Sequence, residues 1–87
     1  MAGCSSFEIL IQGSIPEALH RVKEAALKEG FEFSGDTKGG NFSGSGVVGY
    51  YTVSANIVSI KITALGFPAS SKYDCETLED KVREFFG

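Results

Sequence analysis

Three glycines near the middle of the 87-residue chain have the spacing of a known ligand-binding motif. Gly44, Gly46 and Gly49 spell G-x-G-x-x-G, the turn in which a helix N-terminus holds a dinucleotide pyrophosphate. That site needs a helix that begins within the motif. The segment 47–54 is instead rich in β-branched and aromatic residues, which favour a strand. We therefore predict no cofactor, and interpret the glycines as strand positions that need a bulge, a bend or a close backbone approach.

Glycines on a curved sheet also leave room where side chains would otherwise stand. Such a concavity can receive a small apolar ligand, and aromatic neighbours can line it. On this basis the candidate ligand-binding residues are Gly44, Gly46, Gly49, Tyr50, Tyr51 and Phe67. Tyr50 and Tyr51 are adjacent in a predicted strand, so they must point to opposite faces of the sheet.

Side chains that could act as a base or a nucleophile are scarce. His20 is the only histidine and lies beside the apolar stripe of a predicted helix, which favours a surface or boundary position. Cys4 and Cys75 are the only cysteines, and neither has a second Cys or His at metal-ligand spacing. We therefore predict two structural or chemically idle thiols and no metal site. A small enzyme that uses His20, with a nearby carboxylate or with Cys75, stays open as an alternative.

The overall charge provides no basic surface for nucleic acid. The formal net charge is -3 and the isoelectric point is about 5.0, whereas nucleic-acid binders normally carry a basic patch. Binding through the sheet face stays open only if Lys38, Lys61 and Lys72 converge there. No apolar run reaches the roughly 20 residues that cross a bilayer, and residues 1–6 lack the features of a signal peptide. We expect a cytoplasmic protein without a membrane span, with residues 1–6 flexible.

Hydrophobic periodicity places a strand and a helix at the start of the chain. The segment 7–12 alternates apolar and polar residues, as a strand with one buried face does. Ser14, Pro16 and Glu17 then have the types and spacing of a helix start. Gly30 is the predicted end of that helix.

A run of strands and a second helix follow. The strands are predicted over 31–34, 42–46, 47–54 and 57–65. The last two are joined through Ala55-Asn56, where Asn56 would adopt a left-handed conformation. One face of the last strand would contain Val58, Ile60, Ile62 and Ala64. The final helix, capped by Ser71 or Asp74, would bury Leu78, Val82, Phe85 and Phe86.

The elements predict a single α+β domain over residues 1–87 with the order β-α-β-β-β-β-α. Short connections and consecutive strands favour an antiparallel sheet with two helices packed on one face. Phenylalanines are expected to fill the helix–sheet interface, because aromatic side chains dominate small cores.

Two resemblances add to this interpretation. The element order resembles the β-α-β4-α arrangement of TATA-binding-protein-like domains and of small helix-grip folds that enclose ligands. The segment 42–49, together with 57–62, Pro68 and the helix with Leu78 and Val82, is similar to small proteins encoded with bacterial polyhydroxyalkanoate systems. The chain departs from that family at 69–71, which are small and polar where bulky apolar residues are expected. The resemblance implies a fold and a non-enzymatic role, and offers no catalytic motif.

Together these features predict a small non-enzymatic binding or accessory module. It would contact a small apolar ligand or a protein partner through its glycine-rich curved sheet. A homodimer is one arrangement that this interpretation allows. Nucleic acid is not an expected partner.

Overall fold

The computed structural model describes residues 3–86 and confirms the predicted α+β class and order. The elements are β1 (Phe7–Leu10), α1 (Ile15–Lys28), β2 (Glu32–Gly35), β3 (Gly39–Gly44), β4 (Val47–Ser54), β5 (Ile57–Leu65), a short 3-10 helix η1 (Ala69–Ser71) and α2 (Cys75–Phe85). The two longest strands, β4 and β5, have the predicted bounds, whereas β3 begins three residues earlier than expected, at Gly39.

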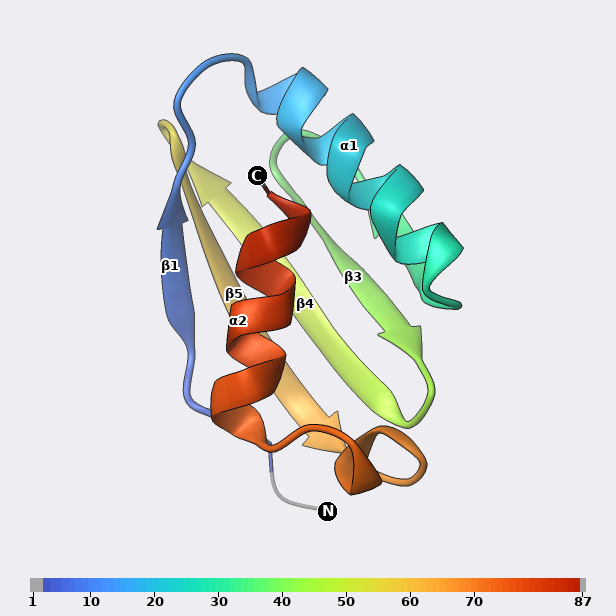
Figure 1. The fold of residues 1–87 in the computed structure, drawn as a ribbon. Helices are drawn as coiled ribbons and strands as arrows, with labels where there is room; N and C mark the ends of the chain where they lie inside the picture. The colour runs from blue at the N-terminus through green and yellow to red at the C-terminus, as the bar shows by residue number, and fades with distance from the viewer. Residues whose placement is uncertain (1–2, 87) are drawn as a thin grey trace.

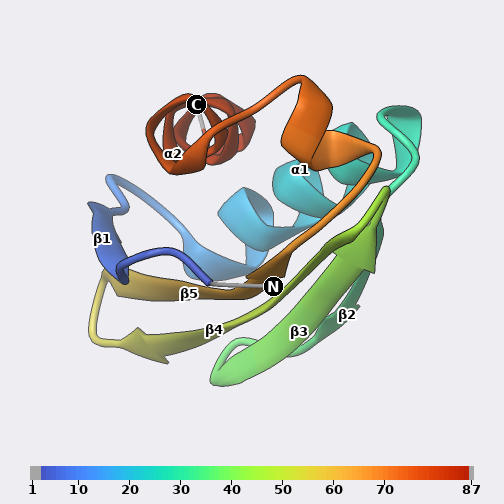
Figure 2. The same ribbon diagram turned by 90° about the horizontal axis from the view of Figure 1, so that it is seen from below.

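All five strands form one antiparallel sheet in the order β1-β5-β4-β3-β2. Both helices lie on the same face of this sheet, as predicted (Figure 1). Figure 2 shows the sheet curving around them, with α2 toward the β1 side and α1 toward the β2 side. The interior of the protein is therefore the space between two helices and the concave face of the sheet.

Helix α1 begins and ends where the sequence predicts. The backbone N–H of Glu17 donates to Ser14 Oγ over 3.5 Å, and Pro16 lies in the first turn, where it needs no hydrogen-bond donor. Gly30 follows the last turn with φ of 86°, a left-handed conformation that glycine adopts without a steric penalty. The buried face of the helix consists of Ala18, Leu19, Val22 and Ala26.

A β-bulge in β5 corrects the predicted faces of that strand. Val48 pairs with Ala64 and Gly49 pairs with Ile62, so Thr63 is an extra residue on β5. The side chains beyond it change face: Leu65 is buried and Ala64 is not, whereas the alternation had assigned Ala64 to the apolar face. A strict period of two cannot reveal an inserted residue.

The turn between β4 and β5 also differs from the expectation. The residue with positive φ is Ala55, at 54°, and not Asn56. Asn56 instead extends the pairing with the first strand. Its carbonyl accepts a hydrogen bond from Ile11 N over 2.7 Å, and its side-chain amide donates to Ile11 O over 3.3 Å.

Helix α2 begins with a complete capping box. The carboxylate of Asp74 accepts from Thr77 N over 2.8 Å, while Thr77 Oγ1 accepts from Asp74 N over 2.9 Å. Hydrogen bonds donated to the Asp74 carboxylate by the backbone N–H and the hydroxyl of Thr77 hold the pKa of Asp74 below its ordinary value. Of the two predicted caps, Asp74 is therefore the one used, and Ser71 lies in η1.

The best-filled part of the core lies over β4 and β5. Val58, Ile60 and Ile62 are at most 2% exposed, and Val47 on β4 is equally buried. They pack against the apolar faces of both helices, which bury Leu19, Val22, Leu78 and Val82. In the part of the chain that the structure describes, no helix has the length and apolar character needed to cross a membrane.

Candidate functional site: an apolar interior between two helices and the sheet

An apolar cavity lies between α1, α2 and the concave face of the sheet. Its volume is about 30 Å³, room for little more than a water molecule and far below the roughly 300 Å³ at which small-molecule pockets begin. The atoms that face it are apolar, including those of Lys81 and Tyr51. The lining residues are Val22, Ala26, Phe31, Phe33, Phe42, Val47, Tyr51, Ile60, Leu78, Lys81, Val82, Phe85 and Phe86.

The interior is small because the protein's own aromatic rings occupy it. Phe42 on β3 lies opposite Gly49 on β4, and a Cβ placed on Gly49 would come within 2.5 Å of the Phe42 ring. The missing side chain of Gly49 therefore makes room for Phe42. The space that the sequence assigned to a ligand at this position is filled from within.

The aromatic lining is only partly covered. Phe31, Phe33, Phe42 and Phe85 are all of intermediate exposure. Phe31 and Phe85 meet edge to face with ring centroids 6.4 Å apart, which joins the end of α1 to α2. Such rings retain a path to solvent, unlike the fully buried aliphatic side chains beside them.

Tyr51 is the exception among these aromatic residues, because it is buried and hydrogen-bonded. Its ring stacks on Phe33 at 5.2 Å, and its hydroxyl donates to the carbonyl oxygen of Asp36 over 2.8 Å. Burial, with a smaller contribution from the charge of Asp36, raises the pKa of Tyr51. The Asp36 carboxylate accepts from the backbone N–H groups of Lys38 and Gly39, which lowers its pKa and fixes the β2–β3 turn.

A cation stands at the edge of the cavity. Lys81 Nζ lies 2.7 Å from Glu29 Oε1 and 5.7 Å from the ring centroid of Phe85. The hydrogen bond and the opposite charge raise the pKa of Lys81 and lower that of Glu29. This ion pair connects α2 to the C-cap of α1 beside the apolar interior.

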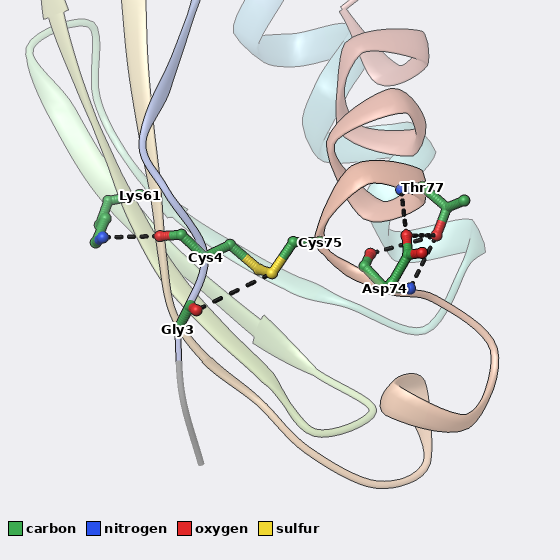
Figure 3. The surroundings of a disulfide bond; sticks show 6 residues. All are labelled: Gly3, Cys4, Lys61, Asp74, Cys75 and Thr77. Atoms are coloured by element: carbon green, nitrogen blue, oxygen red, sulfur yellow. Dashed lines mark hydrogen bonds between the residues drawn. A yellow bond between two sulfur atoms is a disulfide. The ribbon is translucent and has the colours of Figure 1, made fainter.

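A disulfide between Cys4 and Cys75 corrects the prediction of two structural or chemically idle thiols, because neither cysteine is a free thiol. The Cα atoms are 5.5 Å apart, within the usual range for a disulfide, although the residues are separated by 71 positions in the sequence. Spacing along the chain gave no signal, because the fold alone brings the N-terminal segment beside the start of α2 (Figure 3).

The two ends of the disulfide have different surroundings. Cys4 is buried, its N–H donates to Ile62 O over 2.9 Å, and its carbonyl accepts from Lys61 Nζ over 2.7 Å. Cys75 is exposed and is the first residue of α2. Within the segment that we expected to be flexible, residues 1–2 lie outside the described residues, whereas Cys4 is fixed by the contacts above.

The structure does not bring the six predicted ligand residues together. Tyr51 lines the cavity and Gly49 lies beneath Phe42, but Tyr50 points to the opposite face and is 48% exposed. The opposite orientations of the two tyrosines are as predicted. Gly44 ends β3 and Gly46 lies in the β3–β4 turn, with φ of 149° and 92°. Phe67 is 80% exposed in the loop after β5.

The residues of the two alternative functions are also dispersed. His20 Nε2 lies 3.1 Å from Glu24 Oε1, one turn further along α1, and the histidine side chain is 71% exposed. Cys75 is bonded to Cys4 and has no free thiol. Lys61 binds the Cys4 carbonyl, Lys38 lies in the β2–β3 turn, and Lys72 lies near Glu29 on the helix side. Among residues 3–86, no three potential ligands gather into a metal-binding cluster.

Comparison with other proteins adds no further constraint. No protein-family model, curated protein or solved structure matched this chain. The function must be inferred from the geometry of the interior and of its edge.

The sequence did not identify the residues at the edge of the cavity. Val82 belongs to the apolar stripe of α2, and Lys81 is its neighbour in the sequence. A lysine beside such a stripe normally extends its ammonium group into water. Its partner Glu29 follows α1, more than 50 positions earlier in the chain. The phenylalanines were predicted as core residues, but their partial exposure follows from how the two helices sit on the sheet.

Proposed function

We propose that this protein is a non-enzymatic binding module for a small amphipathic carboxylate. The apolar tail of the ligand would enter between the two helices and the sheet, and its carboxylate would pair with Lys81. The observation that carries the proposal is an apolar, aromatic-lined interior with a single lysine at its edge.

The aromatic side chains provide the means of opening. Phe33, Phe42 and Phe85 line the cavity and are all partly exposed, so a ring can turn outward without leaving a sealed core. Displacement of Phe42 would uncover the bare backbone of Gly49 beneath it. An alkyl chain in that place restores the apolar contacts that the ring gives up.

The Lys81–Glu29 ion pair favours a carboxylate as the polar end of the ligand. Glu29 already presents one carboxylate to Lys81 at the edge of the cavity. A ligand carboxylate can replace it while Glu29, whose side chain is 42% exposed, returns to water. The exchange is inexpensive because an ion pair exposed to water contributes little to stability.

A chain-length series of ligands tests this proposal by thermal unfolding. We expect hexanoate, octanoate and decanoate to raise the melting temperature progressively. The reason is that burial of each methylene group contributes about 0.8 kcal/mol to the binding free energy. At ten times the dissociation constant a ligand adds about 1.4 kcal/mol, or about 5–10 °C for a domain of this size. Octanol should give a smaller shift than octanoate at equal concentration.

Two matched lysine variants separate the Lys81 contribution from nonspecific charge. In Lys81→Met the octanoate shift should fall to that of octanol, whereas Lys23→Met, which removes an exposed charge from α1, should keep it. Absence of any shift across the series would contradict a ligand site. An equal loss in both variants would contradict the assignment of the carboxylate to Lys81.

A further inference from the structure

We propose that the Cys4–Cys75 disulfide is a thiol-exchange site, attacked at Cys75 by a low-molecular-weight thiol such as glutathione. Its reduction would release the first turn of α2 from the N-terminal segment. The exchange chemistry stands on the geometry of the disulfide alone. The consequence for ligand entry rests on the proposed function.

The unequal exposure of the two cysteines directs the attack. Cys75 is exposed at the first position of α2, while Cys4 is only 5% exposed and lies in the hydrophobic core cluster. A thiolate must approach a disulfide sulfur from solvent, and exchange depends on which sulfur it can reach. The geometry therefore selects Cys75 for the first step and makes Cys4 the leaving group.

Complete reduction of this disulfide consumes two molecules of the external thiol. In the first step a thiolate attacks Cys75 Sγ, the bond between the cysteines breaks, and Cys4 leaves as a thiolate that takes a proton from water. In the second step another thiolate attacks the external sulfur of the mixed disulfide and releases Cys75. Two thiols are oxidised to one disulfide, and the protein gains two electrons and two protons.

Each cysteine has an anchor that does not depend on the disulfide. Cys4 is held to β5 through Ile62 and Lys61, and these contacts involve only its backbone. The start of α2 is held in helical form by the Asp74–Thr77 capping box. Reduction therefore separates two formed elements that remain able to meet again, as a reversible exchange site requires.

The disulfide is also placed to control one end of α2. The polar and aromatic links from α2 to the rest of the protein lie in its second half. Lys81 pairs with Glu29, Arg83 Nη1 donates to Glu8 O over 3.2 Å, and Phe85 contacts Phe31. The first turn of α2 is instead tied to the N-terminal segment by the Cys4–Cys75 disulfide (Figure 3). Reduction would thus free the end of α2 beside Leu78, a residue that lines the cavity.

Disulfides in reducing compartments are usually transient and respond to the thiol pool. A protein from such a compartment would alternate between a closed, oxidised form and a more open, reduced form.

Peptide mapping of the oxidised protein tests the exchange step. The protein is treated with reduced glutathione, quenched with acid and alkylated, and the mixed disulfides are located by mass spectrometry. We expect at least a tenfold excess of the glutathione adduct on Cys75 over Cys4. A similar or larger amount on Cys4, or no adduct and no reduction, would overturn the exchange site.

Hydrogen exchange of the oxidised and reduced proteins tests the release of α2. After reduction, amides in residues 77–79 should exchange at least tenfold faster than the global unfolding of the reduced protein alone allows, whereas the slowest amides of β4 and β5 should follow that global unfolding. Uniform acceleration or no change would overturn the local release. The mapping experiment starts from the native oxidised protein, so it remains decisive even if reduction unfolds the chain.

Octanoate binding kinetics separate this proposal from the proposed function. Faster association with the reduced protein would support control of entry by the disulfide. Equal rates in both forms would overturn that control but leave the ligand site standing. If octanoate binds neither form, the proposed function fails, while the adduct position and the exchange rates still decide the thiol-exchange proposal.

Discussion

The two sides of the concave sheet face are built from different kinds of side chain. The side formed by β5 and β4 under α2 contains aliphatic residues with no solvent exposure, Val58 and Ile62 among them. The side formed by β2 and β3 contains no fully buried residue, and its inward-pointing side chains include Phe33 and Phe42. We call these the aliphatic side and the aromatic side.

The difference shows how one small domain can combine a fixed core with an adaptable one. Branched aliphatic side chains interlock and leave few alternative packings. Aromatic rings over glycine-rich strands fill space at their edges but keep a route to solvent. The aliphatic side therefore supplies stability, and the aromatic side is where we propose that the ligand binds.

Removal of the disulfide should have the largest effect on stability. It closes a loop of 71 residues, for which the chain-entropy model gives about 4 kcal/mol. We expect the double variant Cys4→Ser, Cys75→Ser to lose about that much in urea unfolding. A loss below about 1 kcal/mol would show that the aliphatic side does not depend on its covalent link to the N-terminal segment.

Truncation on each side of the sheet tests the comparison directly. Ile62→Ala should lower the free energy of unfolding by about 3 kcal/mol, because it leaves a cavity that its neighbours cannot fill. Phe42→Ala, although it removes a larger side chain, should cost only about 1–2 kcal/mol, because the ring is already partly exposed. Equal losses in urea unfolding would abolish the distinction between the two sides.

Addition of one methyl group to Gly49 probes the contact between the two sides. The new Cβ would come within 2.5 Å of Phe42 and within 2.6 Å of the Lys61 carbonyl oxygen. We expect Gly49→Ala to cost about 2 kcal/mol through overpacking. The double variant with Phe42→Ala should recover part of that loss. Strict additivity of the two changes would indicate that the ring does not rest on Gly49.

Acid should weaken the link between the helices with the smallest effect of the series. Glu29 and Asp74 have pKa values lowered by hydrogen bonds from Lys81 and Thr77, so their contribution to stability is complete above the ordinary carboxyl values. The contribution of Glu29 is lost as the pH falls below its ordinary pKa of 4.5 and through its lower folded-state pKa. In Glu29→Gln, urea unfolding should show a weaker decline over this range. An unchanged decline would assign the acid sensitivity to other carboxylates.

The sequence predicted the architecture well because each element has local signals. Ser14 and Gly30 delimit α1, Asp74 begins α2, and alternation located the strands. The errors have a common cause. The extra residue Thr63 and the positive φ of Ala55 depend on how β4 pairs with β5, and the bridge between Cys4 and Cys75 depends on how the two ends of the chain meet.

The candidate site was harder to predict from the sequence than the fold. Glycine spacing pointed to Gly49 and Tyr51, which lie at the cavity, but grouped with them Tyr50 and Phe67, which lie elsewhere. The filling of the space by Phe42 depends on the β3–β4 register. The meeting of Lys81 with Glu29 depends on the placement of two helices, which no local pattern encodes.

The central claim, that the aromatic side receives a carboxylate ligand, is tested most directly by NMR titration of the protein with octanoate. We predict saturable shifts at Phe33, Phe42 and Lys81, while the methyl signals of Val58 and Ile62 and the ring signals of the outward-facing Tyr50 stay in place. Shifts confined to Tyr50 and its outer-face neighbours, or no saturable shift at any residue, would contradict the claim.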